Sequence, residues 1–114
     1  MKLKELKSEE ELEKAISHGL VLVDFSTPWC APCHLQDTII CQLTMQFAGK
    51  ATIAALNIDE HHGIAVRMGI SSIPTLVIFK EGKEVQRFVG LQSEATLSEA
   101  LEDIMDEENI QGEG

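Results

Sequence analysis

The stretch Leu20–Cys33, LVLVDFSTPWCAPC, decides the fold of this chain. Its first part, Leu20 to Phe25, is an almost continuous apolar run, which is typical of a central strand covered on both faces. Beyond the loop that contains Pro28 and Pro32, apolar residues recur every four positions until Gly49 and predict an amphipathic helix. These residues are Leu35, Ile39, Leu43 and Phe47.

The segments that follow predict further strands. Residues 52–58 have the pattern of a second buried strand, and a strand, a crossover helix and a strand form a parallel, right-handed unit. A short helix is expected over residues 63–68. Two more strands, 75–79 and 84–89, flank a turn at Glu81-Gly82 and predict a hairpin. The chain is therefore expected to have an α/β fold.

Helices are expected near both ends of the chain. Ser8, with Glu11 three residues later, predicts a capping box for a helix that stops at Gly19. Ser93 can cap a last helix whose apolar residues follow the helical period. They are Leu97, Ala100, Leu101, Ile104 and Met105. We expect a single domain over residues 1–107 and a frayed acidic tail over residues 108–114.

The composition excludes several classes of function. The chain has 114 residues, a formal charge of −10, one Trp, four Phe and no Tyr. It therefore lacks the basic patches and stacking faces of a nucleic-acid binder, and its charge opposes adsorption to an anionic membrane. Residues 1–7, MKLKELK, carry charges where a signal peptide needs an apolar core, so a cytoplasmic location is expected.

Cys30 and Cys33 have the spacing of a redox pair. In the cytosol thiols are kept reduced, so close cysteines indicate redox catalysis or metal binding. Because the pair lies between a strand and a helix, Cys30 is expected at the helix N-terminus, where the helix dipole lowers the pKa of a thiol. Cys33, one turn later, faces back toward Cys30 and can resolve a mixed disulfide.

Two other motifs compete for these cysteines. Cys30-x-x-Cys33-His34 matches the pattern for covalent haem attachment, a chemistry that normally follows export. A zinc site could recruit both cysteines, Cys41 and a histidine, but eight helical residues put Cys41 about 12 Å from Cys33. Cys41 should instead face solvent or an adjoining groove. It is either a thiol without a role or a site of oxidative regulation or intermolecular pairing.

The motifs together resemble the thioredoxin family over nearly the whole chain. They are VLVDF at 21–25, WCAPC at 29–33, LNID at 56–59, Gly69-Ile70, IPTL at 73–76, Phe79, Gly82 and Val89-Gly90. The resemblance implies a thioredoxin fold, with a central mixed β-sheet flanked by helices on both faces. It also implies a protein-disulfide reductase that receives electrons from NADPH through thioredoxin reductase.

The family also implies the order of events at the cysteines. Cys30 attacks the disulfide of an oxidised protein substrate, and Cys33 closes the ring that releases the reduced product. The Cys30–Cys33 disulfide is then the redox group, and no bound cofactor or metal is expected. We expect a monomer.

Asp24 is the third candidate catalytic residue. A carboxyl group inside an apolar strand should have a raised pKa through desolvation, which suits a group that exchanges a proton with Cys33. A solvent-facing aspartate at a strand end is the alternative. Ala55 stands where the family often has a lysine near this aspartate, so the proton route through Asp24 lacks that lysine in this chain.

A substrate groove is implied around the cysteines. An X-Pro bond is most often trans, but the family implies a cis Ile73–Pro74 bond, which would offer the Ile73 backbone to an extended substrate segment. The expected groove residues are Trp29, Ala31, Pro32, Ile73, Pro74, Gly90 and Leu91. His34 stands where lysine or arginine is common; it either raises the thiolate character of the pair when protonated or is a solvated surface histidine.

Two alternatives to the reductase remain at this point. One is a dedicated redox partner, an electron donor or an oxidase, with the same chemistry. The other is a thioredoxin-fold binding or chaperone module without redox cycling. The joint presence of Cys30, Cys33, Asp24 and Pro74 favours the reductase.

Overall fold

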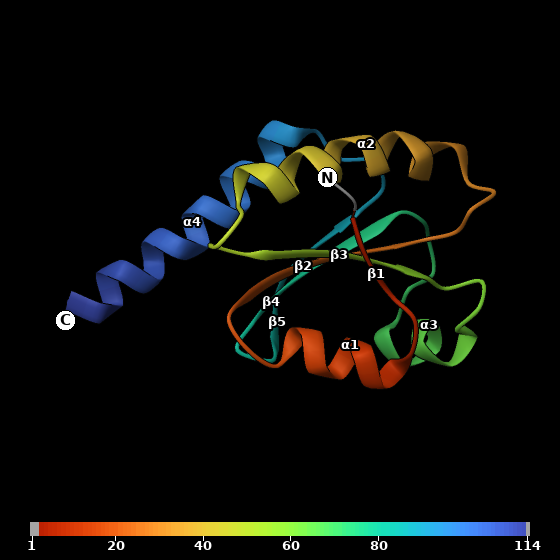
Figure 1. The fold of residues 1–114 in the computed structure, drawn as a ribbon, viewed down its shortest axis with the longest axis horizontal. Helices are drawn as coiled ribbons and strands as arrows, with labels where there is room; N and C mark the ends of the chain where they lie inside the picture. The colour runs from red at the N-terminus through yellow and green to blue at the C-terminus, as the bar shows by residue number, and fades with distance from the viewer. Residues whose placement is uncertain (1–2, 114) are drawn as a thin grey trace.

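Residues 3–113 form a mixed sheet of five strands with two helices on each face (Figure 1). The computed structural model describes the backbone of these residues and the side chains as far as residue 107. The elements are, in chain order, β1 (Lys4–Leu6), α1 (Glu9–Ile16), β2 (Leu20–Ser26), α2 (Ala31–Gln46), β3 (Thr52–Asn57), α3 (His62–Met68), β4 (Thr75–Lys80), β5 (Lys83–Val89) and α4 (Glu94–Glu113).

Strand β2 lies at the centre of the sheet, whose order is β1-β3-β2-β4-β5. Both β1 and β2 run parallel to β3, whereas β4 runs antiparallel to β2 and to β5. Phe25, near the end of β2, pairs with Thr75, the first residue of β4. The loop after β2 and the loop before β4 therefore lie at the same edge of the sheet.

The side chains of β2 divide the core into two layers. Val21, Val23 and Phe25 pack with buried residues of α1 and α3, whereas Leu20 and Leu22 pack with α2 and α4. Figure 1 shows these two helix pairs on opposite faces of the sheet. Because side chains alternate along a strand, Asp24 points into the layer of α2 and α4.

Most of the expected elements are confirmed. Strand β2 is buried from Leu20 to Phe25, and the β4–β5 hairpin turns at residues 81 and 82. Ser8 caps α1, with its side chain accepting a hydrogen bond from the Glu11 N–H at 3.1 Å. Ser93 accepts a hydrogen bond of the same length from the Thr96 N–H at the start of α4. Both helices therefore begin where the capping rules place them.

The buried face of α2 differs from the predicted one. Leu35 was expected in the apolar stripe but leaves 61% of its surface exposed, whereas Gln36 is fully buried. The helix packs on the sheet through Gln36, Ile40, Leu43 and Phe47. At the start of α2 the buried residues therefore lie one position later than the apolar pattern predicts. The reason is that a polar side chain, that of Gln36, faces the core there.

The two ends of the chain hold further differences. Strand β1 was not predicted from the sequence; it adds to the sheet by pairing with residues 54–56 of β3. Helix α4 continues to Glu113, and the single domain expected over residues 1–107 stays a prediction. The expected frayed tail, 108–114, lies outside the residues whose side chains are described. No helix in the described part of the chain has the length and apolar character needed to span a membrane.

Candidate functional site

Cys30 and Cys33 form a disulfide at the N-terminus of α2. Cys30 is the N-cap residue, and its Sγ accepts a hydrogen bond from the Cys33 backbone N–H at 3.2 Å. The two Cα atoms are 5.2 Å apart, and both residues are buried. The expected placement of Cys30 at the helix start, with Cys33 facing back toward it, is confirmed.

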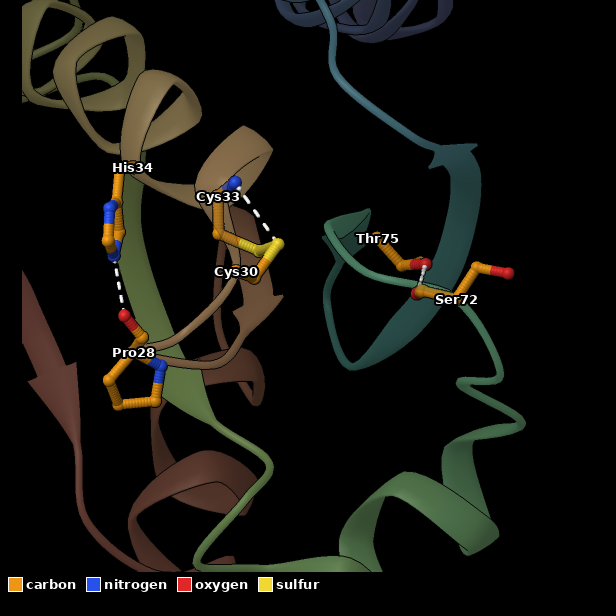
Figure 2. The surroundings of a disulfide bond; sticks show 6 residues. All are labelled: Pro28, Cys30, Cys33, His34, Ser72 and Thr75. Atoms are coloured by element: carbon orange, nitrogen blue, oxygen red, sulfur yellow. Dashed lines mark hydrogen bonds between the residues drawn. A yellow bond between two sulfur atoms is a disulfide. The ribbon is translucent and has the colours of Figure 1, made fainter.

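The residues next to the disulfide are exposed. Trp29 leaves 70% of its surface open to solvent, and Ala31 and Pro32 are exposed in the first turn of α2. Figure 2 shows the sulfur atoms directed toward the segment that carries Ser72 and Thr75. The disulfide is therefore buried, but it is flanked in the sequence by side chains that another protein can reach.

The segment before β4 lies beside this surface because of the antiparallel pairing of β2 and β4. The Ile73–Pro74 bond is cis, as the family resemblance implied. The Thr75 hydroxyl donates a hydrogen bond to the Ser72 carbonyl at 2.6 Å, which closes the turn around that bond (Figure 2). The Pro74 carbonyl in turn accepts a 2.7 Å hydrogen bond from the Gly90 N–H. The two segments that form the expected groove are thus joined through their backbones.

A cavity of about 390 Å³ opens between Trp29 and Ile73. Its wall also includes residues of the β3–α3 loop, of α3 and of the segment after α3. They are Ile58, Asp59, His62, Ala65, Val66, Ile70 and Ser71, and Thr27 of the loop after β2 completes the wall. Val66, with 82% of its surface exposed, adds an apolar rim. On the other side of Pro74, Gly90 has a φ of +93° and Leu91 is 46% exposed.

Gln36 is a residue of the site that the sequence interpretation missed. Its side-chain amide donates to the Gln92 carbonyl at 3.0 Å and accepts from the Gln92 N–H at 2.8 Å. The Gln92 side chain donates to the Gly90 carbonyl at 3.2 Å. A buried amide on the second turn of α2 therefore holds the groove segment that follows Gly90. The sequence does hold one indication of this role, because Gln36 lies on the same face of the helix as the apolar residues Ile40 and Leu43.

Asp24 is fully buried in the core layer of α2 and α4. Neither of its carboxyl oxygens has a hydrogen-bond partner within the described part of the chain. Burial, with a further contribution from the charge of Asp37, raises the pKa of Asp24 from 3.8 to about 7. The expectation of a buried carboxyl with a raised pKa is confirmed, and a solvent-facing Asp24 is excluded. Asp24 is thus able to gain or lose a proton near neutral pH.

A second cavity, of about 570 Å³, lies between α2 and the sheet and is called the Asp37 cavity below. Its wall is formed by α2, β1, the end of β2, β3 and the loop after β2. The lining residues are Leu3, Glu5, Ser26, Thr27, Pro28, His34, Asp37, Cys41, Ala55 and Asn57. Cys41 is a half-buried free thiol in this wall, as expected for a residue that faces an adjoining groove. The imidazole Nε2 of His34 contacts the Pro28 carbonyl (Figure 2).

These residues form a thiol-disulfide centre. Cys30, Cys33 and the groove segments come together at one edge of the sheet, whereas Cys41 lies apart from them in the Asp37 cavity. In the described part of the chain no three His, Cys, Asp or Glu side chains cluster in a way that could hold a metal ion. The chemistry that this arrangement supports is thiol–disulfide exchange: the closed Cys30–Cys33 disulfide can react with an incoming thiol, and the reduced pair can react with an incoming disulfide.

Comparisons with known proteins point the same way. The family model named Thioredoxin matches residues 2–103. Thioredoxin 1 of Nostoc sp. is 44% identical over 82 residues, which are 72% of this chain and 77% of that protein. A thioredoxin of Chlamydia caviae is 42% identical over 79% of this chain and 87% of that protein. The structure of a single-site mutant of a thioredoxin from Halobacterium salinarum, 33% identical, superposes with a TM-score of 0.83 over 88% of each chain.

Proposed function

Because this chain belongs to the thioredoxin family, we propose that it reduces disulfides in other proteins and is recharged with electrons from NADPH through thioredoxin reductase. That it is a disulfide-reducing thiol-disulfide oxidoreductase follows from the family and its cysteine pair. The observation that supports protein substrates is the exposed Trp29 beside Cys30, at the edge of the sheet where two backbone segments able to receive an extended chain are joined through Pro74 and Gly90.

The first step is attack by the Cys30 thiolate on a substrate sulfur. The substrate disulfide breaks, one substrate sulfur leaves as a thiolate that takes up a proton, and a Cys30–substrate mixed disulfide forms. The N-cap position of Cys30 supports this role, because the helix dipole and the Cys33 N–H favour a negative sulfur there. The exposed Trp29, Ala31 and Pro32 form the contact surface.

The second step releases the product. Asp24 accepts the proton of the Cys33 thiol, and the resulting thiolate attacks the Cys30 sulfur. The mixed disulfide breaks, the second substrate sulfur leaves, and the Cys30–Cys33 disulfide closes. Two electrons have then passed to the substrate. The exposed fractions of the two residues support this division of labour, because Cys30 keeps 6% of its surface open beside the exposed Trp29, whereas Cys33 keeps 1%.

The substrate segment binds along Ile73, Pro74, Gly90 and Leu91 in this proposal. The Ile73 backbone pairs with the substrate as an added strand. Gly90 has no side chain to obstruct the approach, and Leu91 supplies apolar contact. The cavity between Trp29 and Ile73 receives a side chain of the substrate next to its cysteine.

We further propose that the protein acts as a monomer in the cytoplasm. A reductase has to be returned to its dithiol form after each cycle, and a reducing compartment maintains that form. The alternative of a thioredoxin-fold binding or chaperone module without redox cycling is not favoured, because both cysteines are present and close enough to form a disulfide.

Reduction of insulin in the presence of NADPH and thioredoxin reductase tests the proposal. The wild-type protein is expected to precipitate the insulin B chain and to consume NADPH, whereas Cys30→Ser abolishes both. Cys33→Ser is expected to accumulate a mixed disulfide that dithiothreitol releases. Absence of turnover in a protein whose two thiols are intact would reject the reductase and favour a binding module.

A further inference from the structure

Ala55 leaves space beside the buried Asp24. The two residues are register partners on neighbouring parallel strands, and Leu76 pairs with Asp24 on the other side. Leu76 is fully buried. Because the side chain of Ala55 is a single methyl group, it reaches only a short way from β3 toward α2. The cavity that lies beyond Ala55 is the Asp37 cavity.

The Asp37 cavity is lined by residues next to Asp24 in the sheet. Ala55 lines it, and so does Ser26, which is the next residue of β2 on the same face as Asp24. Across the cavity, α2 contributes His34, Asp37 and Cys41, which are spaced by about one helical turn each. The cavity therefore extends from the neighbours of Asp24 to side chains at the molecular surface.

Asp37 is the charged group that acts most strongly on Asp24. Its negative charge contributes to the raised pKa of Asp24, and partial burial raises the pKa of Asp37 itself. The charge of His34 lowers the pKa of Asp37, whereas the charge of Glu5 in β1 raises it further. The strand neighbours of Asp24, Ala55 and Leu76, carry no charge. Cys41, a free thiol, also lines the cavity. On the same face of the sheet α4 carries exposed acidic residues, among them Glu94, Glu99, Glu102 and Asp103.

We propose that Asp37 is a positioning residue for proton transfer at Asp24, and that the Asp37 cavity is the path by which this proton reaches solvent. During the resolving step the proton moves from the Cys33 thiol to the Asp24 carboxylate. It then leaves Asp24 for water in the cavity, and Asp24 returns to the carboxylate form. Asp37 acts by holding a negative charge at the cavity wall, which makes Asp24 a stronger base. The inference rests on the proposed role of Asp24 in the reductase.

The protonation of Asp24 can be followed directly by carbon NMR of its carboxyl group in the oxidised protein, where Cys30 and Cys33 do not titrate. The signal is identified by its loss in Asp24→Asn. Asp37→Asn is expected to shift the titration midpoint of Asp24 to lower pH, and Asp37→Glu is expected to restore it. Asp103→Asn, an exposed aspartate of α4, is the matched control and leaves the midpoint in place.

A second variant reaches the same cavity from the sheet. Ala55→Lys brings a positive charge to the wall and is expected to shift the Asp24 midpoint in the same direction as Asp37→Asn. In kinetic measurements, the pH profile of mixed-disulfide resolution should move with the midpoint. An Asp24 midpoint that is unchanged in both variants would overturn the role of Asp37.

The path itself is tested by filling the cavity. Ala55→Leu is expected to slow resolution of the mixed disulfide several-fold while the attack of Cys30 keeps its rate. Ala95→Leu, at an exposed position of α4, is the control. Unchanged resolution in Ala55→Leu would overturn the path. Failure of the wild-type protein to reduce insulin would instead reject the proposed function, and the NMR titration reads the coupling of the two aspartates independently of turnover.

Discussion

Gln36 and Gln92 exchange two hydrogen bonds, of 3.0 and 2.8 Å, across 56 positions of the sequence. Gln36 is fully buried on α2, the helix that begins at the cysteine pair, and Gln92 follows Gly90 in the wall of the groove. The distance between the reactive sulfurs and the groove wall is therefore set by a side-chain amide bonded to the main chain, in addition to apolar packing.

Replacement of Gln36 by leucine is expected to loosen the groove without changing the chemistry. The variant leaves the Gln92 N–H and carbonyl without their partner, and an unsatisfied buried backbone group costs about 1–3 kcal/mol. We expect a lower free energy of unfolding and a raised KM for insulin, with an unchanged rate toward a small disulfide such as bis(2-hydroxyethyl) disulfide.

Gln46→Leu is the matched control for this prediction. Gln46 also lies on α2, and its amide donates a 2.8 Å hydrogen bond to Ser98 of α4, far along the helix from the cysteines. It should lower stability slightly and leave the KM for insulin unchanged. Equal KM values for Gln36→Leu and the wild type would show that the amide pair serves stability alone.

Asp24→Asn is expected to stabilise the fold in a pH-dependent manner. Between pH 3.8 and about 7 the folded protein holds a proton on Asp24 that the unfolded chain has lost, so wild-type stability falls as pH rises through this window. The pKa difference corresponds to a cost on the order of 4 kcal/mol once Asp24 is ionised above pH 7. Urea unfolding at pH 5 and pH 8 measures the effect.

The stabilisation by Asp24→Asn should be large at pH 8 and small at pH 5. The same variant should slow resolution of the mixed disulfide, because an amide accepts no proton from Cys33. Asp103→Asn, on the exposed face of α4, should change neither quantity. Unchanged turnover together with unchanged stability would remove Asp24 from the mechanism.

Gly90→Ala is expected to be destabilising for a conformational reason. Gly90 has a φ of +93°, where an L residue is strained, yet a Cβ at this position would meet no atom within 4 Å. The expected loss in urea unfolding is about 1–2 kcal/mol. Gly63→Ala in α3, which also meets no atom within 4 Å, should instead gain about 0.5–1 kcal/mol, because alanine favours a helix. Similar losses in both variants would contradict the conformational explanation.

Oxidation is expected to act on Cys41 separately from the catalytic pair. In the folded protein with a closed Cys30–Cys33 disulfide, Cys41 is the remaining thiol. If it serves oxidative regulation by intermolecular pairing, non-reducing gels of peroxide-treated protein should show dimers that Cys41→Ser removes. Dimers that persist in Cys41→Ser would show that Cys41 does not join the chains.

The sequence predicted the parts of the fold that local patterns determine. The apolar run of β2, the turn at Gly82 and the caps at Ser8 and Ser93 depend on neighbouring residues, so each was predicted correctly. Strand β1 was missed because its three residues, two of them charged, are held by pairing with β3 rather than by their own pattern. The cis Pro74 and the groove around it came from family resemblance.

The site was predictable where its residues are close in sequence. The Cys30–Cys33 pair at a helix start follows from spacing, and the raised pKa of Asp24 follows from a carboxyl in an apolar run. Gln36 and Asp37 were missed because their roles depend on partners far along the chain. Gln36 needs the backbone of Gln92, and Asp37 matters through a cavity bounded by the small Ala55.

The length of α4 has a consequence for handling the protein. In Figure 1 the last turns of this helix project away from the body along the longest axis, at the end opposite to the start of α2 and its disulfide. A fusion partner, fluorophore or surface linker joined behind α4 would stand clear of the groove. The chain can therefore be immobilised through its carboxyl end and still present its reactive sulfurs to large proteins in solution.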